Sequence, residues 1–263
     1  MRWLARLLRR PRRIEVLSQM LEGMYTAAAG MAAQQSRLDA VANDLANAST
    51  TGYKHVRVAY RDLAYTQGTA GATTAVRVGS GAAATMIGRD NGQGAFQETG
   101  RTLDVAVEGN GYIQVRSGTQ RSLTRDGNLQ IDAQGRLAMQ DGALLDPPVA
   151  LPKGTTEDQV EIGADGTVTV AGKAAGKITL VNVANPGGLD GGADNRFQPT
   201  ATSGAVSAAP RTTVLRAGVL ESSNVDMGEA MTQLMDAQRS FELASKAITM
   251  ADQVQEIANG IKR

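Results

Sequence analysis

Apolar residues recur at helical spacing near both ends of the chain and at alternating spacing in its middle. From Leu21 two rows repeat every seven residues through residues 20–47. The first row is Leu21, Ala28, Gln35 and Ala42, and the second is Met24, Met31, Leu38 and Leu45. Rows spaced in this way share one face of a helix. The pattern predicts a helix on the order of 40 Å long at 1.5 Å per residue.

This helix runs into the stretch "VANDLANASTTGYK", residues 41–54. Asn, Ser and Thr compete with the backbone for hydrogen bonds, and Gly52 can take the left-handed conformation that ends a helix. Asn43 and Asn47 lie one turn apart, so they either cap their own helix or bond to neighbouring backbone or subunits. We expect Lys54 to be solvated, with a role in an assembly contact as the alternative.

The middle of the chain has a different pattern. Residues 66–100 are rich in Gly, Ala, Thr and Ser, which is typical of an extended connector, with a possible short strand at Ala75–Val78. From Leu103 the apolar period is two, and Asp-Gly turns at 126 and 141 separate the runs. The alternating residues are Leu103, Val105, Val107, Tyr112, Ile113, Val115, Leu129, Ile131, Leu137 and Met139. Turn signals every ten or so residues predict a small antiparallel β domain.

The end of the chain returns to helical spacing. Ser223, Asn224 or Asp226 can cap the helix start, and Glu229 can complete a capping box with Asp226. One face carries Met227, Leu234, Phe241 and Ile248 beside Ala230, Ala237, Ala244, Ala251 and Ala258. A second stripe carries Leu243, Met250 and Ile257 beside Ala247, Val254 and Ile261. A helix with two apolar stripes needs partners on two sides.

These patterns predict an α+β protein. Its long N- and C-terminal helices form a coiled-coil-like pair, with an antiparallel β domain inserted between them through Gly-rich connectors. The expected parts are a basic extension at 1–19, an N-terminal helix and motif at 20–65, a connector at 66–100, a β-rich domain at 101–219 and a C-terminal helix at 220–263.

Composition removes most kinds of chemistry. The chain has no cysteine, so disulfides and thiolate metal sites are excluded, and its single histidine, His55, excludes a histidine cluster. "VRVGSGAAA", residues 76–84, resembles a dinucleotide-binding turn, but glycines break the helix that should follow it. We therefore expect no enzyme activity, no cofactor and no metal.

The first 19 residues are a separate problem. They carry six arginines against Glu15, a net +5, which leaves −4 for the rest of a chain whose total is +1. The segment is either a solvated tail or the product of a translation start placed ahead of Met20. It has no continuous apolar core typical of a secretory signal, and no stretch of the chain is long enough to cross a membrane. A basic arm can also bind nucleic acid or an anionic membrane.

Four stretches resemble the bacterial flagellar rod and hook family, in the family's order. They are "MYTAAAGMAAQQSRLDAVANDLANASTTGYK" (24–54), "LDVAVEGNGYIQV" (103–115), "LTRDGNLQIDAQGRL" (123–137) and "LESSNVDMGEAMTQLMDAQRSFELASKAI" (220–248). Within the family the distal rod members are the most similar, because "VRVGSG", "VANPGGLDGGADNRFQ" (183–198) and the length from Met20 also fit them. The basic arm has no counterpart, and Gly228 lies unusually in the first turn of the last helix.

The resemblance implies a structural subunit that is exported without a cleaved signal peptide and polymerised into the hollow drive shaft of the flagellar basal body, outside the cytoplasm. Its implied partners are further copies, neighbouring rod and hook proteins and the export apparatus, with no nucleic acid and no stable membrane insertion. The alternatives are a proximal rod or other hook-basal-body paralogue, and a coiled-coil binding module that uses the basic arm. The residues expected in assembly are Leu21, Met24, Met31, Leu38, Asn43, Leu45, Asn47, Gly52, Lys54, Asn224, Met227, Leu234, Gln238, Phe241 and Ile248.

Overall fold

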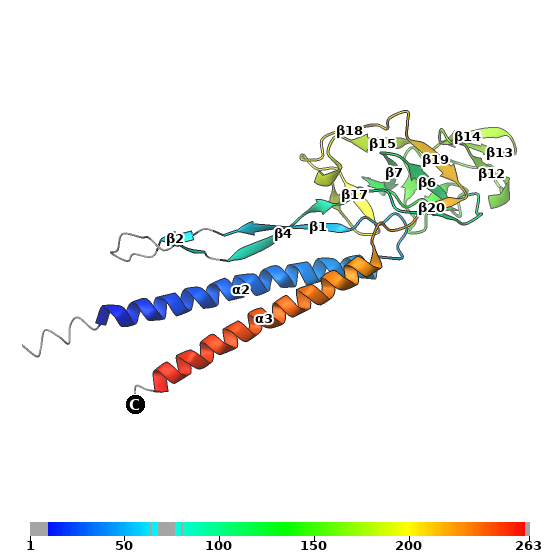
Figure 1. The fold of residues 1–263 in the computed structure, drawn as a ribbon. Coiled ribbons are helices and arrows are strands. Elements are labelled where there is room, and N and C mark those ends of the chain that lie inside the picture. The colour runs from blue at the N-terminus through cyan, green and yellow to red at the C-terminus, as the bar shows by residue number, and fades with distance from the viewer. Residues whose placement is uncertain (1–9, 64, 68–76, 80, 261–263) are drawn as a thin grey trace, which may run out of the picture. The chain divides into compact units, whose positions relative to one another are not determined.

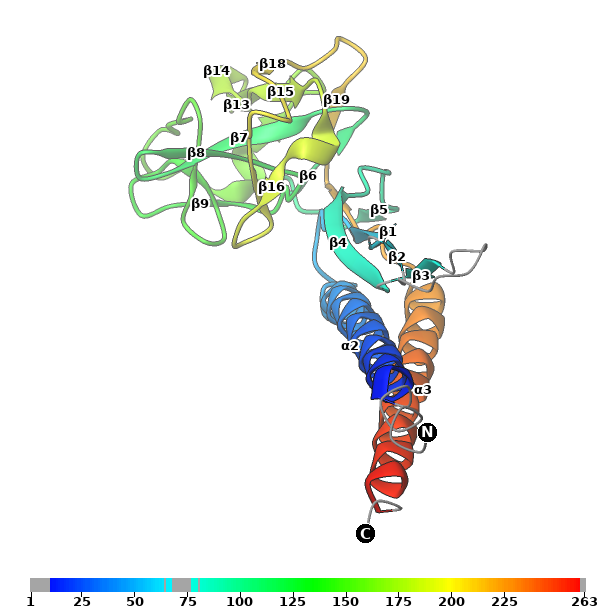
Figure 2. The ribbon, with the colours of Figure 1, turned by 90° about the vertical axis from the view of Figure 1, so that its left-hand side faces the viewer.

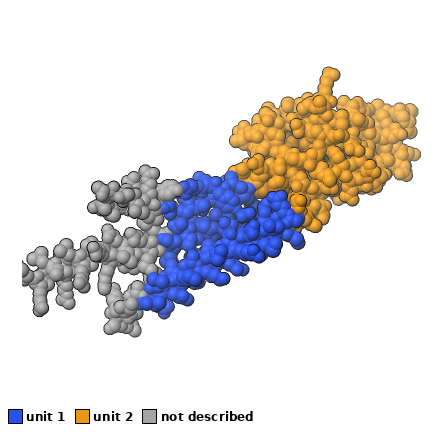
Figure 3. Space-filling model, viewed as in Figure 1, with its two compact units in different colours: residues 1–43, 58–86, 228–263 blue, residues 44–57, 87–227 orange. Residues whose placement is uncertain are grey.

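The computed structural model describes residues 10–63, 65–67, 77–79 and 81–260. The chain forms two compact units, each built from separate stretches (Figure 3). Unit 1 contains residues 1–43, 58–86 and 228–263, and unit 2 contains residues 44–57 and 87–227. The boundaries fall inside long elements, so helices and strands pass from one unit into the other.

Unit 1 is built mainly from two long helices, α2 (Arg10–Ala46) and α3 (Met227–Gly260). Strands β1 (Val56–Asp62) and β4 (Ala82–Arg89) pair in a two-stranded sheet. The short strands β2 (Tyr65–Gln67) and β3 (Arg77–Gly79) pair farther along the same excursion of the chain. Figure 1 shows this excursion as a long, narrow ribbon.

Helix α2 begins at Arg10, so the expected start near Met20 is wrong. Pro11 lies in the first turn, where a missing N–H breaks no helical hydrogen bond, because the first four amides have no acceptor within the helix. Residues 10–19 of the basic extension are therefore part of α2, and residues 1–9 lie outside the described residues.

The covered face of α2 differs in part from the expected one. Ala33, Ala40 and Val41 are buried, and Met24, Met31, Leu38 and Leu45 are half-buried. The other expected row, Ala28, Gln35 and Ala42, is exposed, and the side chain of Leu21 lies outside the described residues. The reason is tertiary, because the excursion contacts Thr26, which shares its seven-residue row with the buried Ala33 and Ala40. That row lies on nearly the opposite side of the helix from the exposed one. Thr26 Oγ1 donates to Gly79 O (3.1 Å), and a Cβ added at Gly81 would lie 3.0 Å from Ala29 Cβ.

On α3 the inward row is largely as predicted. Ala230 and Ala237 are buried, and Leu234, Phe241 and Ile248 are half-buried. Met227, expected in this row, and Gln238 are exposed. The second stripe is exposed at Leu243, Met250, Val254 and Ile257. The helix starts directly after Asp226, and Glu229 lies in its first turn.

Unit 2 is a β domain whose strand pairings are antiparallel. Its elements are β5 (Phe96–Glu98), β6 (Val105–Glu108), β7 (Tyr112–Ser117), β8 (Gln120–Thr124), β9 (Leu129–Ile131), β10 (Leu137–Met139), β11 (Leu144–Leu145), η1 (Glu157–Gln159), β12 (Val160–Ile162), β13 (Thr167–Val170), β14 (Lys173–Lys177), β15 (Leu180–Val183), η2 (Pro186–Gly188), β16 (Asp190–Gly191), β17 (Arg196–Gln198), β18 (Val206–Ala208), β19 (Val214–Ala217) and β20 (Val219–Glu221).

Strand β7 lies at the centre of the largest sheet (Figure 2). It pairs with β8 along most of its length and also with β11 and β15. Three smaller ladders complete the unit: β12–β13–β14, β19–β6 and β20–β5. The last of these joins the end of the expected connector, at Phe96, to Glu221, just before α3. Unit 2 therefore brings the chain segments that precede and follow the β domain into one ladder.

The core confirms the alternating pattern. Leu103, Val105, Val107, Ile113, Val115, Leu129, Leu137 and Met139 belong to one buried cluster. A second cluster surrounds Tyr112 and Phe197, whose rings meet edge to face at 5.7 Å. Ala106 is buried as well, so both faces of β6 are covered. In the expected connector, β2, β3, β4 and β5 are strands, while residues 68–76 lie outside the described part of the chain.

Candidate functional site: a buried joint between distant segments

The residues after α2 and before α3 meet in unit 2. Gly52 N donates to Glu221 O (2.7 Å), and Asn224 N donates to Tyr53 O (3.2 Å). Ser222 N donates to Ala95 O (2.8 Å). These bonds join segments more than a hundred positions apart in the sequence. We use "the joint" for Gly52, Lys54, Arg125, Glu221 and Asn224.

Glu221 is the centre of the joint and is 1% exposed. Its Oε1 accepts hydrogen bonds from Lys54 Nζ (2.5 Å) and Gly94 N (2.9 Å). Its Oε2 accepts one from Arg125 Nη1 (3.3 Å). A buried carboxylate is tolerated only when its charge is paired and its oxygens are hydrogen-bonded, and both conditions are met here.

Lys54 is 1% exposed, so the expectation of a solvated charge is wrong. Its ammonium group donates to Gly92 O (2.6 Å) as well as to Glu221. Desolvation lowers the pKa of Lys54, and the neighbouring Glu221 carboxylate opposes that shift. Sequence position could not reveal this burial, because the covering residues come from far along the chain.

Arg125 is the second cation of the joint and is also buried. Its guanidinium donates to Val107 O (3.2 Å) and Gly109 O (2.8 Å), and it lies over the Tyr112 ring at 5.2 Å. Two cations therefore surround one carboxylate. The excess positive charge is stabilised by hydrogen bonds to backbone carbonyls and by a cation–π contact with an aromatic ring. Arg125 Nε has no hydrogen-bond partner among the described atoms.

Gly52 lets the chain pass close to Arg125. Its φ is +65°, in the left-handed region that L side chains rarely adopt. An added Cβ would lie 2.5 Å from Arg125 C and 2.7 Å from Arg125 O. Glycine was expected here as a helix terminator, but the helix has already ended at Ala46. The close approach to Arg125 is the stronger requirement.

Asn224 bonds to two segments rather than capping α3. Its Oδ1 accepts a hydrogen bond from His55 N (2.8 Å), and its Nδ2 donates to Asp90 O and Gly92 O, both at 3.1 Å. Lys54 also donates to Gly92 O, so the two side chains share one acceptor. Asn224 therefore holds the segment after Gly52 and the segment near residue 90 together.

Tyr53 anchors the end of α2. Its hydroxyl donates to Asp44 Oδ1 (2.8 Å), which also accepts from Val56 N (3.0 Å). Burial, then the hydrogen bond to Asp44, raises the pKa of Tyr53. The Arg89 guanidinium lies over the Tyr53 ring at 5.1 Å and donates to Lys54 O (3.0 Å). These contacts hold residues 44–56 as a compact turn.

Asp126 does more than form a turn. It accepts from Asn128 N (3.2 Å), as its turn position predicts, and also from Thr51 Oγ1 (2.7 Å). Asn195 Nδ2 donates to Thr51 O (2.8 Å), so Thr51 is held from both sides. Burial raises the pKa of Asp126, and the two hydrogen bonds oppose that shift.

The structure brings Gly52, Lys54 and Asn224 together out of the residues expected in assembly. Asn43 is exposed, and Asn47 Oδ1 accepts a hydrogen bond from Thr50 Oγ1 (3.2 Å). Sequence reasoning missed Arg125 and Glu221. The available signal was that both lie inside stretches that resemble the rod and hook family, Arg125 in residues 123–137 and Glu221 in residues 220–248.

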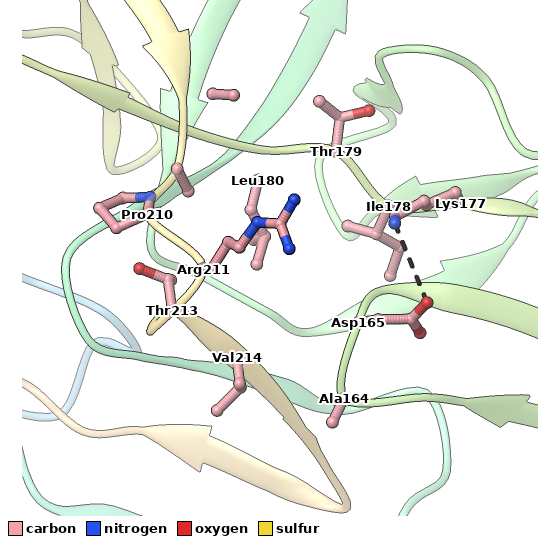
Figure 4. Close-up of a pocket in the computed structure, with 12 residues that line it drawn as sticks. Ala164, Asp165, Lys177, Ile178, Thr179, Leu180, Pro210, Arg211, Thr213 and Val214 are labelled. Atoms are coloured by element: carbon pink, nitrogen blue, oxygen red, sulfur yellow. Dashed lines mark ion pairs between the residues drawn. The ribbon is translucent and has the colours of Figure 1, made fainter.

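Unit 2 also has an open pocket of about 690 Å³. Its lining includes Ile178, Leu180 and Val214 with the charged residues Lys177 and Asp165 (Figure 4). Lys177 Nζ and Asp165 Oδ2 lie 3.9 Å apart and are largely exposed. The lining has no nucleophile paired with a base. Within the described residues, no cluster of His, Cys, Asp or Glu could hold a metal ion, and no helix is long and apolar enough to cross a membrane.

Comparison with known proteins gives matches at both ends and in the β domain. Residues 24–54 match "Flagella basal body rod protein", residues 106–170 match "Flagellar hook protein FlgE/F/G D1 domain", and residues 216–261 match "Flagellar basal body rod FlgEFG protein C-terminal". The flagellar basal-body rod protein FlgG of Bacillus subtilis is 35% identical over 91% of this chain and 99% of the relative. The chain belongs to the flagellar basal-body rod family.

Within this family the chain is similar to distal rod proteins. FlgG of Caulobacter vibrioides is 35% identical over 92% of this chain and its own full length. The hook-basal body complex protein FlhP of Bacillus subtilis is 32% identical over 92% of this chain. The chain is thus a structural component of the flagellar basal body, of the distal rod type, and not an enzyme. All three residues of the joint that the sequence singled out lie in or beside matched segments.

Proposed function

We propose that copies of this chain polymerise through α2 and α3 into the hollow shaft that carries torque from the basal body to the hook. The observation that carries the proposal is the exposed apolar stripe of α3, with Leu243 66%, Met250 62% and Ile257 63% exposed. Soluble monomers rarely leave such a row uncovered, so it is suited to contact with another subunit. Membership in the rod family makes a second rod subunit the expected partner.

Rod assembly also gives a role to the inner rows of the helices. Ala40 on α2 and Ala237 on α3 are almost fully buried. Alanine at such positions permits close approach of neighbouring backbone, and pairing of α2 with α3 as a coiled-coil-like pair would use these faces. The inner rows would then hold each subunit together, and the outer stripe would hold subunits to each other.

Export through a flagellar type III channel, to a site outside the cytoplasm and without a cleaved signal, fits the sequence. With no cysteine, an unfolded chain cannot be trapped by disulfides on its way. Long helices that gain most of their stability from packing would order fully on reaching the growing rod. Neighbouring rod and hook proteins and the export apparatus would be the further partners.

The test is a Leu243→Lys variant in a strain that lacks the gene. Burying a leucine side chain is worth about 1.5–3 kcal/mol, so one lysine per subunit should block incorporation into basal bodies and motility. Because Leu243 is exposed, the free energy of unfolding of the monomer should change by less than about 0.5 kcal/mol. Thr249→Lys, an exposed polar position on the same helix and outside the stripe, adds the same charge as a control. Normal rods built from Leu243→Lys would reject the stripe as an assembly surface.

A further inference from the structure

The charged triad of the joint connects parts of the chain that the β domain separates in sequence. Lys54 follows α2, Glu221 precedes α3, and Arg125 follows β8. Within unit 2 the triad joins the segment that follows the end of α2 at Ala46 to the segment that precedes the start of α3 at Met227. The positions of these two residues matter for assembly only if the rod function proposed above is correct.

We propose that the Lys54–Glu221–Arg125 triad is a register key. It selects one docking of residues 44–57 against residues 219–224, and it adds little to the stability of the fold. A subunit without the triad would stay folded, but residues 44–57 would dock against residues 219–224 in more than one register.

The backbone specifies only one side of this docking. Gly52 is required where the chain approaches Arg125, but the bonds Gly52 N to Glu221 O and Asn224 N to Tyr53 O use main-chain groups at positions 221 and 224 that most residues could supply. A slip of one residue would put Leu220 or Ser222 in the place of Glu221. The buried ammonium and guanidinium groups would then have no anion, which is strongly unfavourable. Only the observed register pairs both cations.

The same geometry argues against a large gain in stability. Removing ions from water costs several kcal/mol each, and a buried pair often does no better than apolar side chains of similar volume. Here two cations share one carboxylate, and the carbonyl oxygens of Gly92, Val107 and Gly109 each accept one further hydrogen bond from them. An excess of buried positive charge therefore adds little to the stability of the fold, but it requires the Glu221 carboxylate to lie beside both cations.

The decisive experiment replaces the triad with apolar side chains of similar size: Lys54→Met, Arg125→Met and Glu221→Leu in the full-length protein. We expect a thermal midpoint within about 5 °C of wild type. In amide NMR spectra the signals of Gly52, Gly94 and Asn224 should split or broaden. Incorporation into basal bodies should fall at least tenfold, on the order of what a 1.4 kcal/mol loss would give.

Two results would overturn the proposal. One is a triple variant with single, sharp signals and normal incorporation, because the triad would then select nothing. The other is a midpoint that falls by far more than 5 °C, or a chain that does not fold, because the triad would then be a main source of stability. If wild-type protein itself is not incorporated, the rod function fails instead, and the spectra still decide on the key.

A single variant gives an independent check. Glu221→Gln keeps the shape but leaves two buried cations without an anion, and exchange of the Gly94 amide should become on the order of 100-fold faster. Adding Lys54→Met to Glu221→Gln should slow the exchange of the Gly94 amide part of the way back to the wild-type rate, because one unpaired cation is removed. Lys177→Gln, which breaks the exposed contact with Asp165, serves as the control and should leave Gly94 unchanged. A double variant with faster exchange than Glu221→Gln alone would contradict the pairing logic.

Discussion

Gly52→Ala should be one of the most damaging single substitutions in unit 2. Three separate costs meet at this position. The backbone is left-handed, with φ at +65°. The new Cβ would lie 2.5 Å from Arg125 C, where ordinary contacts are at least 3.4 Å. The segment must therefore shift by about 1 Å, which strains the Gly52 N to Glu221 O hydrogen bond of 2.7 Å.

The size of the effect can be worked out from these parts. A left-handed alanine costs about 1–2 kcal/mol, and overpacking against backbone costs about 1–3 kcal/mol more. Weakening one buried hydrogen bond adds about 1 kcal/mol. The expected loss is about 3–6 kcal/mol, which is a large part of the 5–15 kcal/mol typical of a folded protein.

Gly118→Ala separates strain from contact. Gly118 has a φ of +61°, and no atom lies within 4 Å of its added Cβ, so this variant should lose only the strain, about 1–2 kcal/mol. Urea unfolding of both variants, followed by near-ultraviolet circular dichroism, measures the difference. Equal losses in the two variants would refute the reasoning, because the approach to Arg125 would then have no energetic consequence.

Two further substitutions test the contacts around the joint. Because burial raises the pKa of Asp126, its contribution to stability is full below about pH 3.8 and is lost as pH rises through the raised pKa. Asp126→Asn should remove this decrease in stability with rising pH. If the urea midpoints of wild type and Asp126→Asn differ by the same amount at every pH from 3.5 to 7, the prediction is wrong. Tyr53→Phe removes the bond to the buried Asp44 and should cost about 1–2 kcal/mol, while Tyr60→Phe, at an exposed ring, should cost almost nothing. Equal thermal midpoints for these two variants would mean that the hydroxyl of Tyr53 does not anchor α2.

The two helices show how well the spacing of apolar residues predicts which face of a helix is buried. The inward row of α3 could be predicted from spacing, because Ala230, Leu234 and Ala237 recur on one face whatever covers them. On α2 the same reasoning chose a row that includes Ala28 and Ala42, and both are exposed. Alanine is compatible with either side of a helix, and the α2 row also contains the polar Gln35, so its spacing carries less information than the α3 row with Leu234. Contacts with the excursion at Thr26 decide which face is covered.

The amino-acid sequence by itself determined the α+β class, the alternating core of the β domain, the exposed second stripe of α3 and the absence of cysteine chemistry. Each of these follows from residues close together in the chain, where period and composition act directly. It also singled out Gly52 as a helix terminator, Lys54 as a solvated charge or an assembly contact, and Asn224 as a candidate helix cap.

The tertiary structure alone decided what those residues do. Lys54 is buried because Glu221, Gly92 and Arg125 arrive from three other parts of the chain, and local sequence cannot express a desolvation caused by distant atoms. The glycine at 52 is required by the backbone of Arg125 rather than by the helix before it. The burial of a charge and the close approach of two backbone segments depend on residues far apart in the sequence. Only the folded structure could therefore show that these residues form the joint.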